Sequence, residues 1–396
     1  MPSSTDSLDA RFRAAQPFAE RGFWRPRVGL ADRLRSLARY AERQGDDLTS
    51  WDGYGERGPV AEVEKRVADL LGTEAAAYFP SGVMAQQVAL RVWTERLGSR
   101  RVALPDLSHL IVHEEDGPRA VHDLDYVHLT TGPVTATAAD LAKVPGELGA
   151  VLVELPLRDA GHLLPTWEEL VALAAACRER GVPFHLDGAR LWESAPHFAR
   201  SLDEIAGLAD SVYVSFYKGL GGLSGAALAG DADFVRESRL WRRRLGGTVW
   251  TAAPHALSAL QGLDEVLPLM PRLHEFAQSL AEAFRASGLR VHPEQPHTNA
   301  FRLYLEGDRD GIRKKVVQAL ERDHVALPFG WQRADVPGWC FTEITVTPEI
   351  LTETPADLVE QLITSIRRRS AFADIKRARG LSSREILDDL RGDRSG

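Results

Sequence analysis

The sequence predicts an α/β protein with a mostly parallel sheet, accompanied by a smaller α+β domain. Three short apolar runs typical of strands, 150–155, 182–186 and 211–215, are separated by segments with helical spacing. A helix between two strands is the crossover that a parallel sheet requires, and helices then cover both faces of the sheet. Ligands of such sheets bind at the carboxyl ends of the strands, so candidate site residues are sought there.

The composition is that of a globular protein with more than one domain. The chain has 396 residues, of which 44% are hydrophobic and 26% charged, and the formal net charge is −8. This charge argues against a protein that binds nucleic acid through an overall positive potential. Two cysteines in so long a chain exclude a disulfide scaffold and a Cys-rich zinc site. With no signal-peptide pattern and no run of 18 apolar residues, we expect a cytoplasmic protein without a membrane span.

The expected elements follow the periodicity of the apolar residues. Residues 1–50 are expected to belong to the small domain or an interface, and residues 371–396 form a tail in which Ser382 and Glu385 match a capping box. The large domain, 51–255, begins with a Gly-rich loop at 52–59 and has expected helices at 60–71, 83–97 and 168–180 and strands at 101–104, 150–155, 182–186, 211–215 and 226–229. The small domain, 256–370, has expected helices at 256–265, 268–286, 311–322 and 355–369 and strands at 290–292, 298–305 and 338–346.

Two segments place polar side chains at the ends of apolar strands. They are HLDGAR at 185–190 and SFYKGLGG at 215–222. Because both fall at the ligand-binding edge of the sheet, they bring together the carboxylate of Asp187, the guanidinium of Arg190 and the amine of Lys218.

Lys218 and Asp187 each allow a plain structural explanation as well as a chemical one. Burial lowers the pKa of a lysine and makes its amine a nucleophile for carbonyls, but Lys218 alone could equally be a surface lysine. Asp187 could cap a turn, bind a metal, or keep a pyridine nitrogen protonated, as a pyridoxal phosphate electron sink requires. Their joint occurrence favours pyridoxal phosphate, because that cofactor requires both an amine that forms a Schiff base and an acid beside its pyridine nitrogen.

A third segment, 78–85, has the pattern of a strand that turns at Ser81 and Gly82 into a helix. The free backbone N–H groups at such a helix start suit a phosphate group. The same pattern is typical of an ordinary N-cap by Ser81, so this segment alone does not distinguish the two.

These motifs resemble those of the threonine aldolase/β-eliminating lyase family of fold-type-I pyridoxal phosphate enzymes. HLDGAR and YKGLGG are the specific pieces. The resemblance implies an aspartate-aminotransferase-like fold, pyridoxal 5′-phosphate as the cofactor, an amino acid substrate, and a homodimer or homotetramer with active sites between subunits. The similar pieces, in the family's order, are 54–90, 108–117, 185–195, 211–230, 242–247 and 297–305.

The resemblance also implies roles for single residues. Lys218 forms the Schiff base, Asp187 pairs with the pyridine nitrogen, and His109 stacks on the cofactor ring and exchanges a proton. Tyr54 contacts the cofactor of a neighbouring subunit. Further cofactor contacts are implied for Ser81, Gly82, Val83, Arg190 and Ser215, and substrate contacts for Arg190, Trp339 and Tyr54.

The sequence departs from the family pattern around the substrate. A family arginine near the phosphate is Trp250 here, and the arginine expected to bind the substrate carboxylate is Trp339, with Glu343 further along the same strand. The two tryptophans favour an apolar or aromatic pocket, or equally a subunit interface. Losing a guanidinium–carboxylate contact costs about 1.5–3 kcal/mol. Three other arginines could replace it, and the sequence does not choose between Arg158, Arg243 and Arg302.

Other classes of protein fit less well. A metal hydrolase could use His109 with His113, or His185 with Asp187, but Gly and Pro near the first pair disfavour a long helix. The Gly-x4-Gly-Lys-Ser/Thr pattern of an NTPase and the GxGxxG of a Rossmann dehydrogenase are absent. A non-catalytic scaffold of the same fold would be expected to lose Lys218 or Asp187, and the sequence has both.

The expected reaction is aldol cleavage of a β-hydroxy-α-amino acid to glycine and an aldehyde. The substrate replaces Lys218 on the cofactor, and His109 takes the proton of the β-hydroxyl, directly or through water. The altered substrate contacts decide which bond at the α-carbon breaks. β-Elimination, racemisation and transamination of an apolar or aromatic amino substrate therefore stay open.

Overall fold

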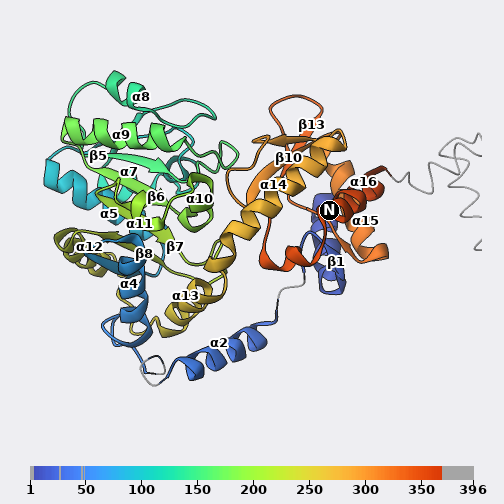
Figure 1. Ribbon diagram of the computed structural model, residues 1–396, viewed down its shortest axis with the longest axis horizontal. Coiled ribbons are helices and arrows are strands. Elements are labelled where there is room, and N and C mark those ends of the chain that lie inside the picture. Colours follow the sequence, from blue (N-terminus) through green and yellow to red (C-terminus); the bar gives the residue numbers. More distant parts are fainter. Residues whose placement is uncertain (1–3, 26–27, 46–47, 49, 368–396) are drawn as a thin grey trace, which may run out of the picture. The chain divides into compact units, whose positions relative to one another are not determined.

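The computed structural model describes residues 4–25, 28–45, 48 and 50–367. Within these residues the chain divides into two compact units (Figure 1). The smaller unit comprises 4–25, 306–340 and 353–367, and the larger unit comprises 28–305 and 341–352. The expected domain boundaries at residues 50, 255 and 370 stay a prediction. The expected tail, with Ser382 and Glu385, lies outside the described residues.

A seven-stranded sheet forms the centre of the larger unit. Its strands are β2 (Ala75–Phe79), β3 (Arg101–Leu104), β4 (Asp125–His128), β5 (Ala150–Glu154), β6 (Phe184–Gly188), β7 (Ser211–Ser215) and β8 (Ala226–Gly230). Their order in space is β2-β8-β7-β6-β5-β3-β4. The five strands from β7 to β4 run parallel, while β8 is antiparallel to both of its neighbours. The mostly parallel sheet confirms the predicted α/β class.

Helices connect these strands, as the crossovers of a parallel sheet demand. A capping box joins Thr166 and Glu169 through reciprocal hydrogen bonds of 2.9 and 3.2 Å, and a second one joins Ser201 and Glu204. The helices are α2 (Leu30–Gln44), α4 (Gly58–Leu71), α5 (Gly82–Leu97), α6 (His109–Val112), α7 (Gly117–His122), α8 (Ala138–Lys143), α9 (Trp167–Arg180), α10 (Leu191–Phe198), α11 (Leu202–Ala206), α12 (Ala232–Arg244), α13 (Ala253–Glu265) and α14 (Met270–Ala286), with 3-10 turns η2 (Leu267–Leu269) and η3 (Pro348–Thr352).

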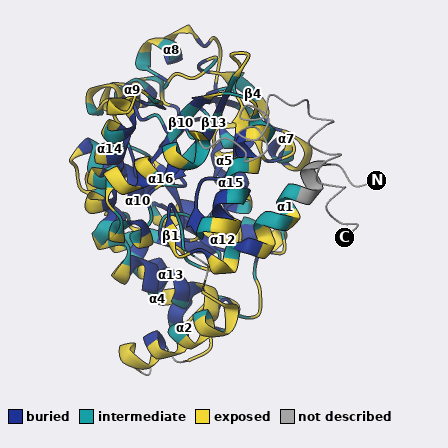
Figure 2. Ribbon diagram, turned by 90° about the vertical axis from the view of Figure 1, so that its right-hand side faces the viewer, coloured by how far each residue is buried: buried dark blue, intermediate teal, exposed yellow. Residues whose placement is uncertain are grey.

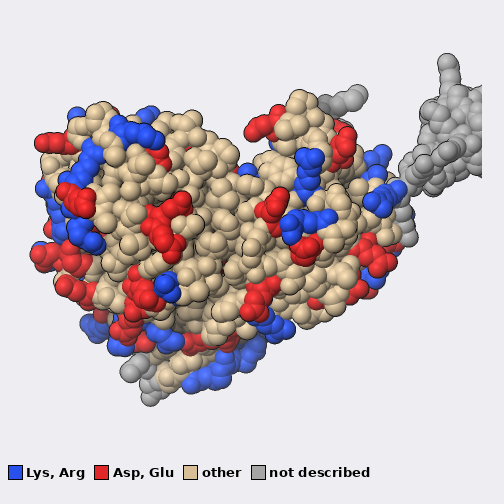
Figure 3. All heavy atoms as spheres, turned by 45° about the horizontal axis from the view of Figure 1, so that its top comes forward, with Lys and Arg blue, Asp and Glu red and all other residues tan. Residues whose placement is uncertain are grey.

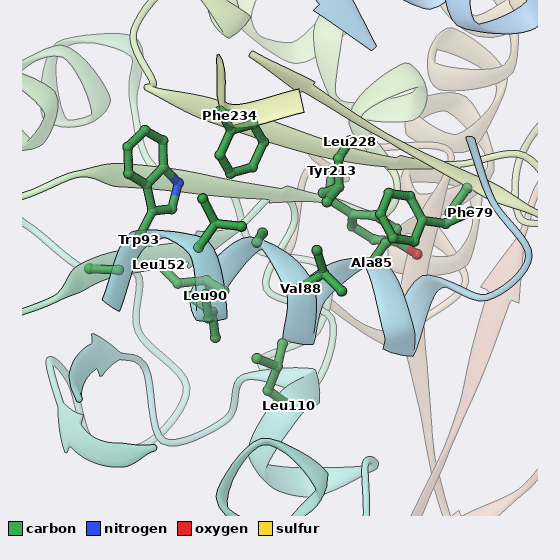
Figure 4. Packing of buried hydrophobic residues seen from close by; sticks show 14 of the residues in the cluster. Phe79, Ala85, Val88, Leu90, Trp93, Leu110, Leu152, Tyr213, Leu228 and Phe234 are labelled. Atoms are coloured by element: carbon green, nitrogen blue, oxygen red, sulfur yellow. The ribbon is translucent and has the colours of Figure 1, made fainter. Parts of the chain in front are cut away.

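Helix α5 is the core helix of this unit. Figure 4 shows it crossing close to the strands, with Val88 and Trp93 pointing into the layer that also holds Tyr213 and Phe234. The helix is buried over most of its circumference, so its apolar residues do not form a single stripe. It ends at Gly98, whose left-handed backbone with φ 67° favours glycine. This packing fixes the start of α5, at Gly82, relative to the strand ends.

A second, smaller sheet has four strands in the order β12-β13-β10-β9, of which β12 comprises Gln332–Arg333. Its strands β9 (Arg290–His292) and β10 (Ala300–Glu306) pair antiparallel, and β10 is the neighbour of β13 (Trp339–Thr345). The boundary between the units crosses β13, so that Trp339 falls in the smaller unit and Glu343 in the larger one. Helix α2, by contrast, is exposed along most of its length (Figure 2) and is held by Tyr40, whose hydroxyl donates to Asp264 at 2.7 Å.

The smaller unit packs its N-terminal segment against helix α15. One cluster of buried apolar residues comprises Ala15, Ala19, Leu320 and Ala326, and the ring of Phe12 stacks on Phe329 with centroids 3.9 Å apart. The elements of this unit are α1 (Ser4–Ala15), η1 (Gln16–Phe18), β1 (Arg21–Gly22), α15 (Arg309–Asp323), β11 (Val325–Ala326), β12 (Gln332–Arg333) and α16 (Pro355–Arg367), and β1 pairs parallel with β11.

The surface carries both signs of charge. On the face that Figure 3 shows, acidic and basic side chains are interspersed. None of the helices in the described part of the chain combines the length and the apolarity needed to cross a bilayer.

Candidate active site

Three neighbouring parallel strands end in polar residues at one edge of the large sheet. Glu154 ends β5 and lies opposite Asp187 of β6 in the ladder, and Lys218 comes shortly after the end of β7, the next strand. The carboxyl ends of parallel strands share one edge, so residues distant along the chain meet there. The structure thus brings together the carboxylate and the amine that the sequence singled out.

Asp187 is a buried carboxylate. Its residue is 2% exposed, and among the described residues its side chain accepts one hydrogen bond, from the backbone N–H of Ala189 to Oδ1 at 3.1 Å. Burial raises the pKa of Asp187, and the charge of Lys218 opposes this. The ionised form of a buried carboxylate is stabilised by a positive charge beside it. Lys218 supplies one, but burial has the larger effect on the pKa of Asp187.

Lys218 sits in a tight turn whose backbone is held by Gly221 and Gly222. The N–H of Gly221 donates to the carbonyl of Lys218 at 3.1 Å, and that of Gly222 to the carbonyl of Phe216 at 2.8 Å. Burial, and after it the guanidinium of Arg190, lower the pKa of the Lys218 amine, while nearby carboxylates oppose the shift. A lowered pKa favours the neutral, nucleophilic amine.

Glu193 packs its side chain against this turn at Gly219. It belongs to α10, is 2% exposed, and occupies the space that a Cβ on Gly219 would need. Gly219 is therefore required by close approach, because any side chain would collide with the carboxylate. Burial raises the pKa of Glu193, and its Oε2 atom has no hydrogen-bond partner in the described part of the chain.

His109 opens the short helix α6 and is held by two carboxylates. Its Nδ1 lies 3.1 Å from Oε1 of Glu114, and its backbone N–H donates to Oε2 of Glu154 at 3.0 Å. The hydrogen bond with Glu114 raises the pKa of His109, and burial opposes it. For Glu154, burial and the neighbouring Asp187 raise the pKa to about 7. These contacts give His109 a fixed orientation near Asp187 and Lys218. The charge of Lys218 lowers the pKa of His109, and that of Asp187 raises it.

The start of α5 offers backbone donors. Ser81 takes the N-cap position but makes no capping hydrogen bond with its side chain, so the first N–H groups of the helix are not used by it. A Cβ on Gly82 would collide with the hydroxyl of Tyr213, which explains the glycine. Val83 is exposed. The arrangement suits an anion, since a helix of this length presents its positive end here.

The other predicted site residues lie in different surroundings. Ser215 is fully buried and its hydroxyl donates to the carbonyl of Ala189 at 2.8 Å, which links the loops after β6 and β7. Arg190 is half-buried, and its positive charge lowers the pKa of Lys218. It makes no ion pair with any of the described residues. Tyr54 packs edge-on against Trp250 and lines a cavity of about 430 Å³ whose lining contains neither Lys218 nor Asp187. Trp339 belongs to the smaller unit, and its role stays a prediction.

His185, considered above as a metal ligand, has both ring nitrogens in hydrogen bonds with other side chains. Its Nδ1 lies 2.7 Å from Oγ of Ser211 and its Nε2 2.7 Å from Oε1 of Gln86. Burial lowers its pKa to about 3. A neutral imidazole with both nitrogens engaged has no lone pair left for a metal. No group of three or more His, Cys, Asp or Glu in the described ranges is arranged to hold a metal ion.

Four site residues were not singled out from the sequence. Glu154 had a recognisable sign, because it is the charged residue that ends an otherwise apolar strand. Glu114 and Glu193 lie within the quoted family-like segments but carry no local pattern that marks them as buried. The fourth, His162, is described below.

Comparisons with known proteins agree with this geometry. The sequence model of the β-eliminating lyase family matches residues 37–307. Among solved structures, the chain is similar to a candidate L-allo-threonine aldolase from Listeria monocytogenes (36% identity over 92% of this chain and 99% of the other, TM-score 0.82). It is also similar to a candidate aromatic amino acid β-eliminating lyase/threonine aldolase from Exiguobacterium (34%, 90% and 99%, TM-score 0.82). A low-specificity L-threonine aldolase of Arabidopsis thaliana is 26% identical over 71% of this chain and 80% of its own.

Proposed function

Because this chain belongs to the β-eliminating lyase family, we propose that it cleaves the Cα–Cβ bond of a β-hydroxy-α-amino acid to give glycine and an aldehyde. It is a pyridoxal-phosphate-dependent lyase with the fold of the fold-type-I enzymes. The observation that carries the proposal is the meeting of Lys218, Asp187 and a carboxylate-bound His109 at one sheet edge. The similarity to relatives named as threonine aldolases supports aldol cleavage over the other reactions of such sites.

The residues at the sheet edge fit pyridoxal phosphate. Lys218 offers an amine whose pKa burial lowers, Asp187 offers a buried carboxyl group, and the start of α5 offers N–H groups that the Ser81 side chain does not use. When bound, the cofactor supplies an electron sink for the pair released at the substrate α-carbon. Asp187 would keep the pyridine nitrogen protonated, and Ser81 and Gly82 would begin the phosphate site. The predicted contacts of Val83 and Ser215 belong to the same proposal.

His109 is assigned the proton transfer. Its imidazole takes the proton of the β-hydroxyl while the Cα–Cβ bond breaks, so that the oxygen becomes the aldehyde carbonyl. A proton delivered to the α-carbon then completes glycine. Glu114, bonded to Nδ1, keeps the ring oriented and stabilises its protonated form.

Arg190 is assigned to the substrate carboxylate. Among the described residues its guanidinium has no ion pair, and it lies close enough to Lys218 to lower that residue's pKa. A guanidinium so placed matches a carboxylate with two parallel hydrogen bonds. The predicted homodimer or homotetramer, the contact of Tyr54 with a neighbouring subunit, and the cytoplasmic location stay predictions.

The direct test is a glycine assay. The holoenzyme is incubated with threonine, allo-threonine and phenylserine, and glycine and the aldehydes are measured. Release of both products from at least one substrate supports the proposal. Absence of glycine from all three, with the cofactor bound, contradicts it. Measuring ammonia and 2-oxo acids in the same reactions detects β-elimination.

The Glu114–His109 contact predicts the pH dependence of this reaction. The base has to be unprotonated, so activity falls as the pH drops through the pKa of His109, which Glu114 holds above its ordinary value of 6.5. Glu114→Gln removes that effect, and we expect the acidic limb of kcat/KM to move to lower pH by about one unit.

The neighbouring exposed Glu115 provides the matched control. Glu115→Gln removes the same charge from the same loop, and the profile should stay as in the parent enzyme. An unchanged acidic limb in Glu114→Gln would show that His109 is not the group that titrates.

A further inference from the structure

Arg158 and Glu343 form an ion pair within the larger unit. Arg158 lies in the loop after β5 and Glu343 on β13, and Nη2 of Arg158 donates to Oε2 of Glu343 at 2.7 Å. The side chains are 25% and 22% exposed. Nη1 of Arg158 lies 3.8 Å from Oδ1 of Asp159, beyond hydrogen-bond distance, and has no acceptor in the described part of the chain. The pair therefore offers an open donor beside an accessible carboxylate.

This pair is tied to the loop that carries His109. Oε2 of Glu154 accepts the backbone N–H of His109 at 3.0 Å, and Oε1 accepts that of Arg158 at 3.3 Å. A second link joins Nε2 of His113 to Oδ2 of Asp159 at 2.7 Å. One buried carboxylate thus places the proposed base and the ion pair on its two sides, at the edge that holds Asp187 and Lys218.

His162 lies behind the pair. Its side chain is 1% exposed, and its φ of 63° is a strained conformation for a residue other than glycine. Nε2 lies 3.4 Å from Oε1 of Glu343 without the geometry of a hydrogen bond, and neither ring nitrogen has a hydrogen-bond partner among the described residues. Burial lowers the pKa of His162, the contact with Glu343 opposes this shift, and the nearby guanidinium of Arg190 adds to it. Against the effect of burial, His162 and Arg158 together lower the pKa of Glu343 to about 2, so its carboxylate stays ionised between them.

Arg302 and Arg243, the other two arginines considered from the sequence, lie in different surroundings. Nη2 of Arg302 donates to the carbonyl of Asp159 at 2.8 Å, and its guanidinium lies over the ring of Phe341. Arg243 lines the cavity next to Tyr54. Of the three arginines that the sequence left open, Arg158 alone is both partly exposed and fixed beside His109.

We propose that the Arg158–Glu343 pair, backed by His162, recognises the β-hydroxyl of the substrate and excludes substrates with charged side chains. The inference rests on the proposed function and assigns its substrate class: β-hydroxy-α-amino acids whose β-substituent is neutral. Arg190 keeps the α-carboxylate, so the two guanidinium groups have different partners.

The charge balance of the pair supports this class. The β-hydroxyl oxygen accepts a hydrogen bond from the open Nη1 of Arg158 and keeps its one proton for His109, while Glu343 holds the guanidinium of Arg158 in place. The positive charge of Arg158 and the negative charge of Glu343 cancel. A second carboxylate on the substrate would face Glu343, and an ammonium group would face Arg158, and either contact is repulsive.

The first experiment separates the hydroxyl contact from carboxylate binding. In the holoenzyme, Arg158→Gln should lower kcat/KM for threonine or phenylserine by about 10- to 100-fold and change the Kd of glycine, which has no side chain, by less than about twofold. Arg190→Gln should weaken glycine and threonine alike. Equal weakening of glycine and threonine in Arg158→Gln would overturn the proposal.

The second experiment tests whether the pair discriminates against substrates with charged side chains. Glu343→Gln should raise the ratio of kcat/KM for β-hydroxyaspartate to that for threonine by about tenfold or more, because a like charge is removed. An unchanged ratio would contradict the proposal. If Arg158→Gln folds poorly because Glu343 is left unpaired, the double variant Arg158→Gln/Glu343→Gln replaces it. Arg178→Gln, exposed on α9, is the control for loss of charge alone.

A third arm does not depend on which bond is cut. Serine and alanine differ by one hydroxyl, and their equilibrium binding is followed through the absorbance of the bound cofactor. The parent enzyme should bind serine more tightly, and Arg158→Gln should bring the two Kd values together. If no substrate yields glycine but this preference is present and lost in the variant, the aldolase assignment fails and the inference stands. No preference for serine in the parent enzyme would overturn the inference.

Discussion

Replacement of Lys218 by alanine is expected to abolish turnover, with a loss of at least about 10⁴-fold in kcat. The amine of Lys218 is the proposed nucleophile of the site, and its charge acts on the buried carboxylate of Asp187. Burial lowers the pKa of Lys218, so its charged form is disfavoured in the fold, and replacement by alanine removes that cost. The thermal midpoint of the apoprotein should therefore stay the same or rise. Kinetics and a melting curve on the same preparation test both statements.

Lys65 gives the matched control for this substitution. It is exposed on α4 and pairs with Asp69 at 2.9 Å, so Lys65→Ala should leave kcat unchanged. The absorbance band that the holoenzyme shows when the cofactor is covalently attached should be absent from Lys218→Ala and present in Lys65→Ala. Turnover in Lys218→Ala within tenfold of the parent enzyme would refute the role of this amine.

Replacement of Asp187 has the second largest expected effect. A buried charge that loses its partner costs about 3–5 kcal/mol, which corresponds to a loss of about 10²–10⁴-fold in rate or cofactor affinity. Asp187→Asn keeps the shape and the hydrogen bond from Ala189 but cannot hold a proton on a pyridine nitrogen. We therefore expect this variant to bind the cofactor and to turn over at least about 10²-fold more slowly. Asp187→Ala should in addition lose cofactor affinity.

The control for Asp187 is Asp69→Asn at the exposed end of α4, which should have no effect on rate. Titration of cofactor into the apoproteins gives the affinities, and initial rates at saturating cofactor give kcat. Full turnover of Asp187→Asn would show that the carboxylate does not govern the electron sink. The whole assignment of the sheet edge would then need revision.

The α/β class and the central pair of residues were predictable because they depend on short-range patterns. The strands Arg101–Leu104, Ser211–Ser215 and Arg290–His292 have the predicted bounds, and the other predicted strands differ by one or two residues at one or both ends. β4 was not predicted, because Asp125–His128 alternates polar and apolar residues over four positions only. Lys218 and Asp187 stood out since each directly follows an apolar run, and the rule that parallel strands end at one edge then brings them together.

Glu193 and Glu114 could not be found in this way. A carboxylate on a helix or in a loop is usually exposed, and nothing local distinguishes one that packs beneath a glycine or against a histidine. Gly219 illustrates the point: the sequence explains it by the flexibility of a turn, while the structure explains it by the carboxylate of Glu193 in the space of its Cβ.

By itself, the sequence determined the fold class, through the periodicity of its apolar residues, and the cofactor, through motifs of consecutive residues that resemble a family of pyridoxal phosphate enzymes. The same motifs predicted Lys218 and Asp187 as the residues that hold the cofactor ring. The tertiary structure alone decided which arginine stands beside the proposed base. Arg158, Arg243 and Arg302 are equivalent as letters, but the fold surrounds them differently, with Glu343, the cavity at Tyr54, and Asp159 with Phe341, respectively. Glu343 lies 185 residues from Arg158 along the chain. An ion pair depends on where the chain folds back, and no local pattern records that distance.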